Sequence, residues 1–323
     1  SHLAGIENSQ SADMETNGPG ATEKTAYFQP QNLQAWQAIK LRHPDAPMVA
    51  GGTDLVLQIS TQYADMPQLI DITRIEELQH CELGQQHVTL GAGLSYSDVE
   101  RKLEATLPRF VALLQQLGSP QIRNRGSLGG NIANASPVAD TPPMLLALDA
   151  KLKLFDVSGS ARELPLDEFY VAYKQTQLQP SEIIVSLSLP LAALADFHRF
   201  YKITKRYDDD IASVLGAFRF SLGPNHSIRD ARIAYGGMAA TPLRVPAAEQ
   251  TLIGKSIRDP RSLDPAIAVL ENTLQPIDDV RASSAYRRAM AVNLLRKAWL
   301  ELGGAKLPSV HATPASSAGV QGA

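Results

Sequence analysis

Hydrophobic residues recur at helical spacing near the start of the chain. Leu33, Trp36 and Ile39 follow one another at intervals of three, which predicts a short amphipathic helix. We expect this helix to end before His43, because the residue ahead of a proline is disfavoured in the helical region.

Two later segments show further helical stripes. In residues 97–117, Ser97 and Glu100 have the spacing of a capping box, and apolar residues continue the pattern at Val99, Leu103, Leu107, Phe110, Leu113, Leu114 and Leu117. In residues 292–302, a stripe leads into two glycines, an ending that is typical of a helix C-terminus; the stripe consists of Val292, Leu295, Trp299 and Leu302.

Short apolar or alternating runs predict strands at residues 48–50, 69–72, 87–90, 151–154 and 183–189. Residues 214–222 and 228–235 alternate with period two around Gly223-Pro224-Asn225, which predicts a hairpin. Because the pattern changes after Pro190, we expect a domain boundary near residues 191–197. The predicted fold class is α+β, with a larger domain over 26–192 and a smaller α+β domain over 197–304.

Both ends of the chain lack such periods. Residues 1–25 carry no charged-then-apolar signal pattern and resemble a linker or a tag remnant. Residues 305–323 are rich in Ala, Ser, Gly and Pro. We expect both segments to be disordered.

Composition excludes several classes of protein. The 30 Lys and Arg nearly balance 33 Asp and Glu, which disfavours nucleic acid or an anionic membrane as a partner. The lone cysteine, Cys81, excludes an intrachain disulfide framework and any cysteine-held zinc or iron–sulfur cluster built from this chain alone. No stretch approaches the roughly 20 apolar residues of a membrane span. The simplest expectation is a cytoplasmic protein without a metal site.

The first candidate motif, Val-Ala-Gly-Gly-Thr-Asp-Leu, occupies residues 49–55. A strand that runs into two glycines lets the backbone approach a bulky anion and aim N–H groups at phosphate oxygens, and Thr53 adds a hydroxyl. A plain turn remains the alternative for this motif taken alone. Neither a Walker loop nor a G-x-G-x-x-G fingerprint occurs in the chain, so Rossmann-type binding is not supported.

The second motif is the long Gly/Ser/Asn-rich run at 118–140. A loop of this length without its own structure is usually functional or disordered. Its glycines would admit a ligand closely, and Asp140 could accept from ribose or ribityl hydroxyls. Neutral donors are available at Ser127, Asn131, Asn134 and Ser136. A solvated loop with turn chemistry is the alternative.

The third motif spans residues 201–212 and holds an acidic triplet, Asp208 to Asp210. Adjacent carboxylates point in different directions, and neighbouring Lys and Arg would neutralise them. A metal site is therefore disfavoured against a charged connector.

Taken in order, the three motifs resemble the FAD-binding domain of xanthine dehydrogenases, within the medium-subunit flavoproteins of molybdenum hydroxylases. The resemblance rests on V-A-G-G-T-D-L, on Q-I-R-N-R-G-S-L-G-G-N-I-A-N-A-S-P-V-A-D and on Y-K-I-T-K-R-Y-D-D-D-I-A, and it extends over residues 26–304. It implies a two-part FAD-binding domain of the vanillyl-alcohol-oxidase/xanthine dehydrogenase type, followed by the small α+β domain.

The resemblance also implies a set of cofactor-binding residues. The FAD pyrophosphate would be cradled by Met48, Val49, Ala50, Gly51, Gly52, Thr53, Asp54 and Leu55, and the cradle would be completed by Ser127, Gly129, Gly130 and Asn131. Asn134 and Asp140 would hold polar groups of FAD, and Ile184 would line the adenine or flavin pocket. Lys202 would lie close to the flavin and stabilise its reduced form. Leu117 takes the place of a Phe that animal relatives carry beside the cofactor.

In the family that the chain resembles, electrons pass from a molybdenum centre through 2Fe–2S clusters to FAD, which gives a hydride to NAD. This implies an iron–sulfur domain or subunit and a molybdenum-cofactor subunit as partners, in a hetero-oligomer active in purine catabolism. The segment 205–210 would border the nicotinamide side of the flavin, with Tyr173 nearby. Two alternatives stay open: the flavoprotein of a carbon monoxide dehydrogenase or aldehyde oxidoreductase with a quinone or oxygen acceptor, and a non-catalytic nucleotide-binding assembly module.

Overall fold

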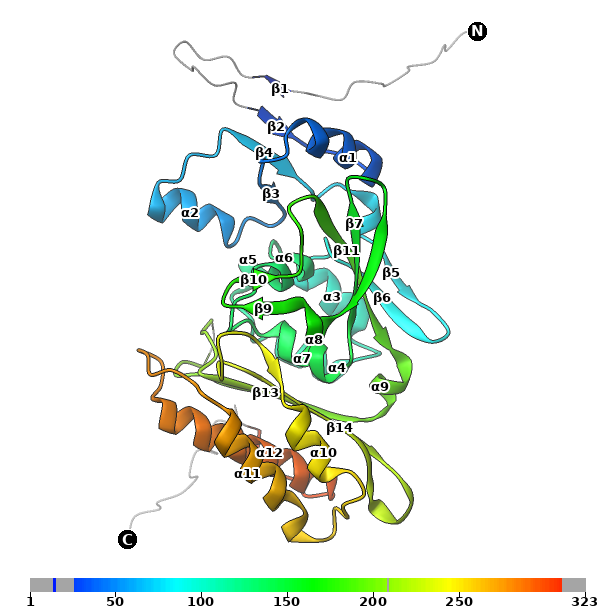
Figure 1. Cartoon of the computed structure of the whole chain (residues 1–323), viewed down its shortest axis with the longest axis vertical. Coiled ribbons are helices and arrows are strands. Elements are labelled where there is room, and N and C mark those ends of the chain that lie inside the picture. Colours follow the sequence, from blue (N-terminus) through cyan, green and yellow to red (C-terminus); the bar gives the residue numbers. More distant parts are fainter. Residues whose placement is uncertain (1–13, 16–25, 208, 310–323) are drawn as a thin grey trace, which may run out of the picture.

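The computed structural model describes residues 14–15, 26–207 and 209–309. Within them, three larger sheets follow one another along the long axis of the molecule (Figure 1). Apart from residues 14–15 and 305–309, the segments expected to be disordered lie outside the described residues.

The first sheet has the order β1-β2-β4-β3, and its strands are β1 (Met14–Glu15), β2 (Ala26–Phe28), β4 (Gln68–Asp71) and β3 (Met48–Val49). Helix α1 (Leu33–Arg42) buries Trp36 completely against this sheet, beside Phe28 and Ile70. Helix α2 (Leu55–Gln62) follows β3 and buries none of its residues. Figure 1 shows α2 standing off to one side of the sheet.

The second sheet is antiparallel and has the order β5-β6-β11-β7-β8; these strands are β5 (Cys81–Leu83), β6 (His87–Gly91), β11 (Glu182–Pro190), β7 (Lys151–Asp156) and β8 (Ala161–Pro165). Apolar residues from four of the five helices between β6 and β7 form one core with this sheet, and the short third helix buries none of its residues. These helices are α3 (Tyr96–Leu103), α4 (Pro108–Leu114), α5 (Pro120–Arg123), α6 (Leu128–Ala133) and α7 (Thr141–Ala147). Helix α8 (Leu166–Phe169) leads into a hairpin of β9 (Tyr170–Ala172) and β10 (Gln175–Thr176), and α9 (Leu191–Ala195) leads into the third sheet.

The third sheet is also antiparallel, with the order β12-β13-β14-β15, and its strands are β12 (Phe197–Ile203), β13 (Val214–Leu222), β14 (Ile228–Gly236) and β15 (Leu243–Arg244). One face packs against α10 (Pro246–Leu252), α11 (Asp264–Thr273) and α12 (Ser284–Leu302). The opposite face packs against α7 of the preceding part of the chain. Short 3-10 helices cover Glu76–Leu78, Pro224–His226 and Pro260–Leu263.

Several sequence predictions are confirmed. Helix α1 ends at Arg42 with His43 as its C-cap, strands β13 and β14 form the expected hairpin, and α12 ends before Gly303.

Two predictions are wrong. The capping box belongs to Ser95 and Asp98 rather than to Ser97 and Glu100, because Ser95 is the extended residue that precedes α3.

The run at 118–140 is not an unstructured loop. It contains α5 and α6, and it leads directly into α7. Serine residues cap both short helices: Ser119 accepts a hydrogen bond from the Ile122 amide, and Ser127 accepts one from the Gly130 amide.

Candidate functional site

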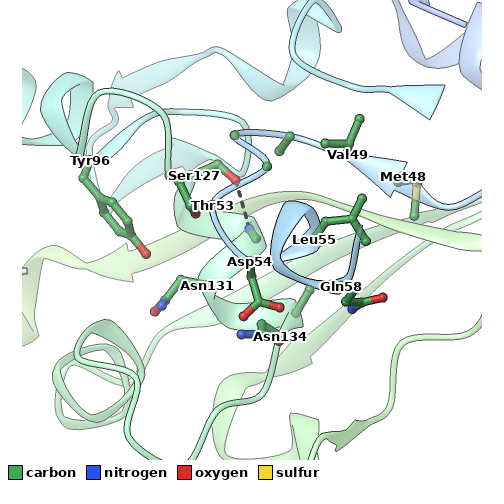
Figure 2. A pocket seen from close by; sticks show the side chains of 16 residues that line it. Met48, Val49, Thr53, Asp54, Leu55, Gln58, Tyr96, Ser127, Asn131 and Asn134 are labelled. Atoms are coloured by element: carbon green, nitrogen blue, oxygen red, sulfur yellow. Dashed lines mark hydrogen bonds between the residues drawn. The ribbon is translucent and has the colours of Figure 1, made fainter. Parts of the chain in front are cut away.

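The first two sequence motifs meet at one cavity of about 330 Å³. One wall is the loop between β3 and α2, and the other is formed by α6 and the turn ahead of it. Figure 2 shows side chains from both walls, with Tyr96, Asn131 and Asn134 opposite the segment 53–58. The lining residues are Met48, Val49, Ala50, Gly51, Gly52, Thr53, Asp54, Leu55, Gln58, Tyr96, Gly126, Ser127, Gly130, Asn131, Ala133 and Asn134.

The two glycines of the first motif have separate structural reasons. A Cβ atom on Gly51 would lie 1.7 Å from the carbonyl oxygen of Arg125, so the two walls touch backbone to backbone there. Gly52 adopts a φ of +73°, in the left-handed region that glycine enters without a steric penalty. Gly51 therefore packs the β3–α2 loop against the second motif, whereas Gly52 allows the turn within that loop.

The glycines of α6 differ in position. A Cβ atom on Gly130 would lie 2.8 Å from Ser127 Oγ, at the cavity wall. A Cβ atom on Gly129 would lie 2.6 Å from that of Ala92, and Gly129 does not line the cavity. Gly129 thus allows α6 to pack closely on the second sheet, whereas Gly130 keeps the cavity wall bare.

A second cavity, of about 250 Å³, adjoins the first, because Asn131 and Asn134 line both. Its other lining residues come from the end of α4 onward and from the segment after β12; they are Leu117, Gly118, Ser136, Val138, Ala139, Asp140, Asp209, Asp210 and Ile211. The two cavities together form an elongated site that passes from the first sheet toward the third.

Asp140 and Lys202 form a buried ion pair beside this second cavity. Lys202 Nζ lies 2.7 Å from Asp140 Oδ2 and 2.8 Å from the backbone oxygen of Gln116, and the side chains are 2% and 8% exposed. Burial raises the pKa of the Asp140 carboxyl above its usual value, while the charge of Lys202 opposes that shift. Asp140 Oδ1 has no hydrogen-bond partner among the described residues. The site thus holds a spare acceptor at Asp140.

Besides Gly129, three more residues named from the sequence lie away from the cavity linings. Lys202 is occupied by Asp140 and lines neither cavity. Ile184 is buried in β11 opposite Leu154, within the core of the second sheet. Tyr173 is exposed in the turn between β9 and β10.

Sequence reasoning missed Tyr96 and Gln58, which line the first cavity. The Tyr96 ring packs over Gly126, and a Cβ atom on Gly126 would lie 2.9 Å from that ring. Gln58 follows the first motif by one helical turn of α2, so the periodicity of that helix was the only available signal.

Two family models match the chain in succession. The model described as "FAD binding domain in molybdopterin dehydrogenase" matches residues 22–192, and "CO dehydrogenase flavoprotein C-terminal domain" matches residues 199–302. The chain belongs to this FAD-binding family. The predicted fold class is confirmed: an α+β FAD-binding domain is followed by a flavoprotein C-terminal domain.

Curated relatives include xanthine dehydrogenases. The chain is 30% identical to xanthine dehydrogenase of Emericella nidulans over 283 residues, which cover 84% of this chain and 21% of that protein. It is 32% identical to xanthine dehydrogenase/oxidase of Gallus gallus over 234 residues, or 68% of this chain and 17% of that protein. The chain thus spans about a fifth of the length of these relatives.

A solved structure of carbon monoxide dehydrogenase from Hydrogenophaga pseudoflava is also similar. It superimposes with a TM-score of 0.80 at 27% identity, and the match covers 86% of this chain and 96% of that chain.

The residues of the elongated site fit an FAD molecule. The loop between β3 and α2 and the start of α6 expose glycine backbone at Gly52 and Gly130, which suits close approach of a pyrophosphate, and Thr53 and Asn131 add neutral donors. The carboxylates of Asp54 and Asp140 suit sugar or ribityl hydroxyls rather than phosphate, because a carboxylate is an acceptor only.

Within the described part of the chain, no helix combines the length and apolar character that a bilayer span requires. Among the residues that the structure describes, no group of three or more His, Cys, Asp or Glu side chains is placed to hold a metal ion.

Proposed function

We propose that this chain is the FAD-bearing electron-transfer component of a xanthine dehydrogenase, with domains at 26–192 and 197–304. It would take electrons from 2Fe–2S clusters and pass them as hydride to NAD. The observation that carries the flavin part is the pair of adjoining cavities, which are lined by glycines at one end and by Asp140 at the other, where the buried Oδ1 atom has no hydrogen-bond partner among the described residues. The xanthine dehydrogenase assignment is supported by the curated relatives.

The residues divide the cofactor between them. The segment 48–55 with Ser127, Gly130 and Asn131 would hold the pyrophosphate, and Asn134 with Asp140 would hold the hydroxyls between pyrophosphate and ring. Leu117 would contact the isoalloxazine in the second cavity. When bound, FAD supplies reversible electron and hydride chemistry, while the protein binds and orients it. Gly129 and Ile184 would support these walls from behind.

Lys202 would act on the flavin through Asp140. Its ammonium is bound to a carboxylate at 2.7 Å, so the pair presents little net charge to the cavity. The ion pair would orient the Asp140 carboxylate. Lys202 binds its Oδ2 atom, and its Oδ1 atom would accept a hydrogen bond from the cofactor. The proposed stabilisation of reduced flavin is therefore weaker than a free lysine would give.

The NAD part of the proposal rests on the segment after β12. Asp210 accepts hydrogen bonds from the amides of Lys205 and Arg206, each at 3.0 Å, and from the Arg206 side chain at 3.0 Å. These bonds lower the pKa of the Asp210 carboxyl to about 2. Asp209, Asp210 and Ile211 line the second cavity, so this segment, in which Asp210 is paired with Arg206, would border the ring end of FAD. It would govern the approach of NAD, with exposed Tyr173 as a further contact.

Partners belong to the same proposal. The chain has one cysteine, so the clusters and the molybdenum cofactor would lie on other domains or chains of a hetero-oligomer. Helix α2 leaves Val56, Leu57 and Ile59 exposed beside the cofactor site, a surface that such a neighbour could cover. The expected cytoplasmic location and role in purine catabolism are tested by fractionation of the source cells and by substrate oxidation of the complete enzyme.

Reconstitution with FAD tests the function directly. The purified chain is incubated with FAD, desalted and examined for flavin absorbance, and bound flavin is then titrated anaerobically with NADH. We expect one FAD per chain and bleaching by NADH. A chain that retains no flavin would favour the non-catalytic module. Bound flavin that NADH does not bleach would favour a flavoprotein with a quinone or oxygen acceptor.

A further inference from the structure

Helix α7 lies between the second and third sheets, and all seven of its residues are buried. Figure 1 shows it between the strands above and β13 and β14 below. An aspartate stands at each end of the helix: Asp140 is its N-cap residue, and Asp149 follows two residues after its last turn. Both aspartates bind basic side chains of the third sheet.

The face of the third sheet that meets α7 has a matching pattern. Because side chains alternate along a strand, β13 turns Leu215, Ala217 and Arg219 toward α7 and the residues between them toward α10–α12. Lys202 pairs with Leu215, Ala217 with Ala234, and Arg219 with Arg232 in the strand register. The face is therefore apolar in the middle, with a lysine at one end and two arginines at the other.

The spacing of the two charged ends also agrees. Positions 215 and 219 of β13 are about 13 Å apart at the usual rise of a strand. Positions 140 and 147 are about 10 Å apart at the rise of an α-helix, and Asp149 follows two residues beyond the helix. An apolar helix with an acidic residue at each end thus lies on an apolar stripe with basic residues at each end.

Asp149 makes the more extensive of the two charged contacts. Its Oδ2 lies 2.7 Å from Arg219 Nη2, and its Oδ1 lies 2.7 Å from Arg232 Nε and 3.5 Å from Arg244 Nη1. Arg219 is only 6% exposed. Asp149 itself has a φ of +52°, a conformation that few residues other than Gly, Asn and Asp adopt readily. One aspartate therefore binds three arginines from three strands.

The cofactor cavity depends on the same junction. Its walls come from Leu117 and Asp140 on one side and from the segment 209–211, which leads into β13, on the other. The backbone crosses the junction as well, since the Gly237 amide donates to the Pro137 oxygen at 2.8 Å. The distance between the cavity walls is thus set by how the third sheet lies on α7.

We propose that Asp149 is a positioning residue for the flavin: by holding the arginines of β13, β14 and β15 at the far end of α7, it fixes the cavity wall that the third sheet supplies. The proposal rests on FAD binding as the proposed function. Without the Asp149 charge the three arginines would still have acidic partners, because Arg219 and Arg232 also bind Asp230, and Arg244 also binds Glu249. The sheet would stay folded while its seating on α7 loosens.

Asp149→Asn tests this role, since asparagine keeps the side-chain shape and tolerates the positive φ. FAD affinity is measured at 15 °C, after circular dichroism has tested whether each variant is folded. The apo protein is compared by hydrogen exchange at the Gly237 amide. We expect at least a fivefold weaker FAD affinity and faster exchange at Gly237. Arg232→Gln removes one of the contacts of Asp149 and should cause a smaller loss of FAD affinity and a smaller rise in Gly237 exchange. This variant replaces Asp149→Asn in the test if Asp149→Asn does not fold.

Glu182→Gln is the matched control. It removes a short ion pair, Arg162 Nε to Glu182 Oε1 at 2.6 Å, that lies within the second sheet. It should lower the melting temperature and leave FAD affinity and Gly237 exchange unchanged. Unaltered FAD affinity in Asp149→Asn, or an equal loss in Glu182→Gln, would overturn the inference. If the wild-type chain binds no FAD, the proposed function fails, and unchanged Gly237 exchange in Asp149→Asn would then overturn the positioning role independently.

Discussion

Gly51→Ala probes the closest backbone contact of the site. The added Cβ atom would lie 1.7 Å from the Arg125 carbonyl oxygen and 2.3 Å from its carbon, well inside contact distance. Neither partner is a flexible side chain, so the β3–α2 loop must move away from the turn ahead of α6. Overpacking of this kind typically costs about 1–3 kcal/mol. If about 2 kcal/mol of it appears as a displaced cavity wall, FAD affinity falls roughly 30-fold, because 1.4 kcal/mol is tenfold.

The assay compares FAD affinity by flavin fluorescence with thermal melting. We expect a melting temperature roughly 2–10 °C lower, together with the loss of affinity. Gly303→Ala is the matched control, since its Cβ atom would meet nothing closer than 3.4 Å and its φ of −74° is ordinary. Wild-type affinity and melting in Gly51→Ala would refute the view that the two motifs touch through their backbones.

Three further predictions concern the second cavity. Lys202→Met removes the ion-pair partner of a buried carboxylate and should destabilise the chain by about 3–5 kcal/mol in thermal melts. In the control variant Lys202→Met/Asp140→Leu, stability should recover and FAD affinity should not. An unchanged melting temperature in the single variant would contradict the reasoning. The Asp210 pKa is lowered to about 2 from 3.8, so its contribution to stability is complete above 3.8 and is lost as the pH falls through about 2. Hydrogen exchange at the Lys205 and Arg206 amides should lose protection as the pH falls through about 2, and full protection well below pH 2 would exclude this cause. Leu117→Phe adds an aromatic contact worth about 0.5–1.5 kcal/mol, so FAD affinity should rise roughly 2- to 10-fold; weaker binding would mean that the cavity is too narrow for the ring.

The sequence predicted the site through residue types that are hard to place elsewhere. Two adjacent glycines after a strand, and a second pair inside a Ser/Asn-rich run, both indicated backbone that must come close to something. The structure shows that Gly51 approaches the other motif, and that Gly129 approaches Ala92 rather than a ligand. Residue type therefore located the site, but it could not separate glycines that face the cavity from glycines that face the core.

Short helices and long-range charges were beyond sequence reasoning for different reasons. Helices α5 and α6 have four and six residues, too few for an apolar period to repeat, so only the capping serines could have revealed them. Ser97 and Ser95 offer nearly the same capping spacing, and only the extended backbone of Ser95 decides between them. The partners of Asp149 are 70 residues or more away in sequence, and no local pattern marks them.

The three sequence motifs lie on three different sheets. The first follows β3, the second surrounds α6 on the second sheet, and the third follows β12. A molecule bound along both cavities would therefore contact all three sheets at once. Because a ligand that binds only the folded state stabilises it by RT ln(1 + [L]/Kd), FAD at 100 times its Kd would add about 2.7 kcal/mol. If bound FAD contacts all three sheets, they should unfold together and share this gain. In calorimetry, FAD should then raise the temperature of a single unfolding transition rather than that of one among several.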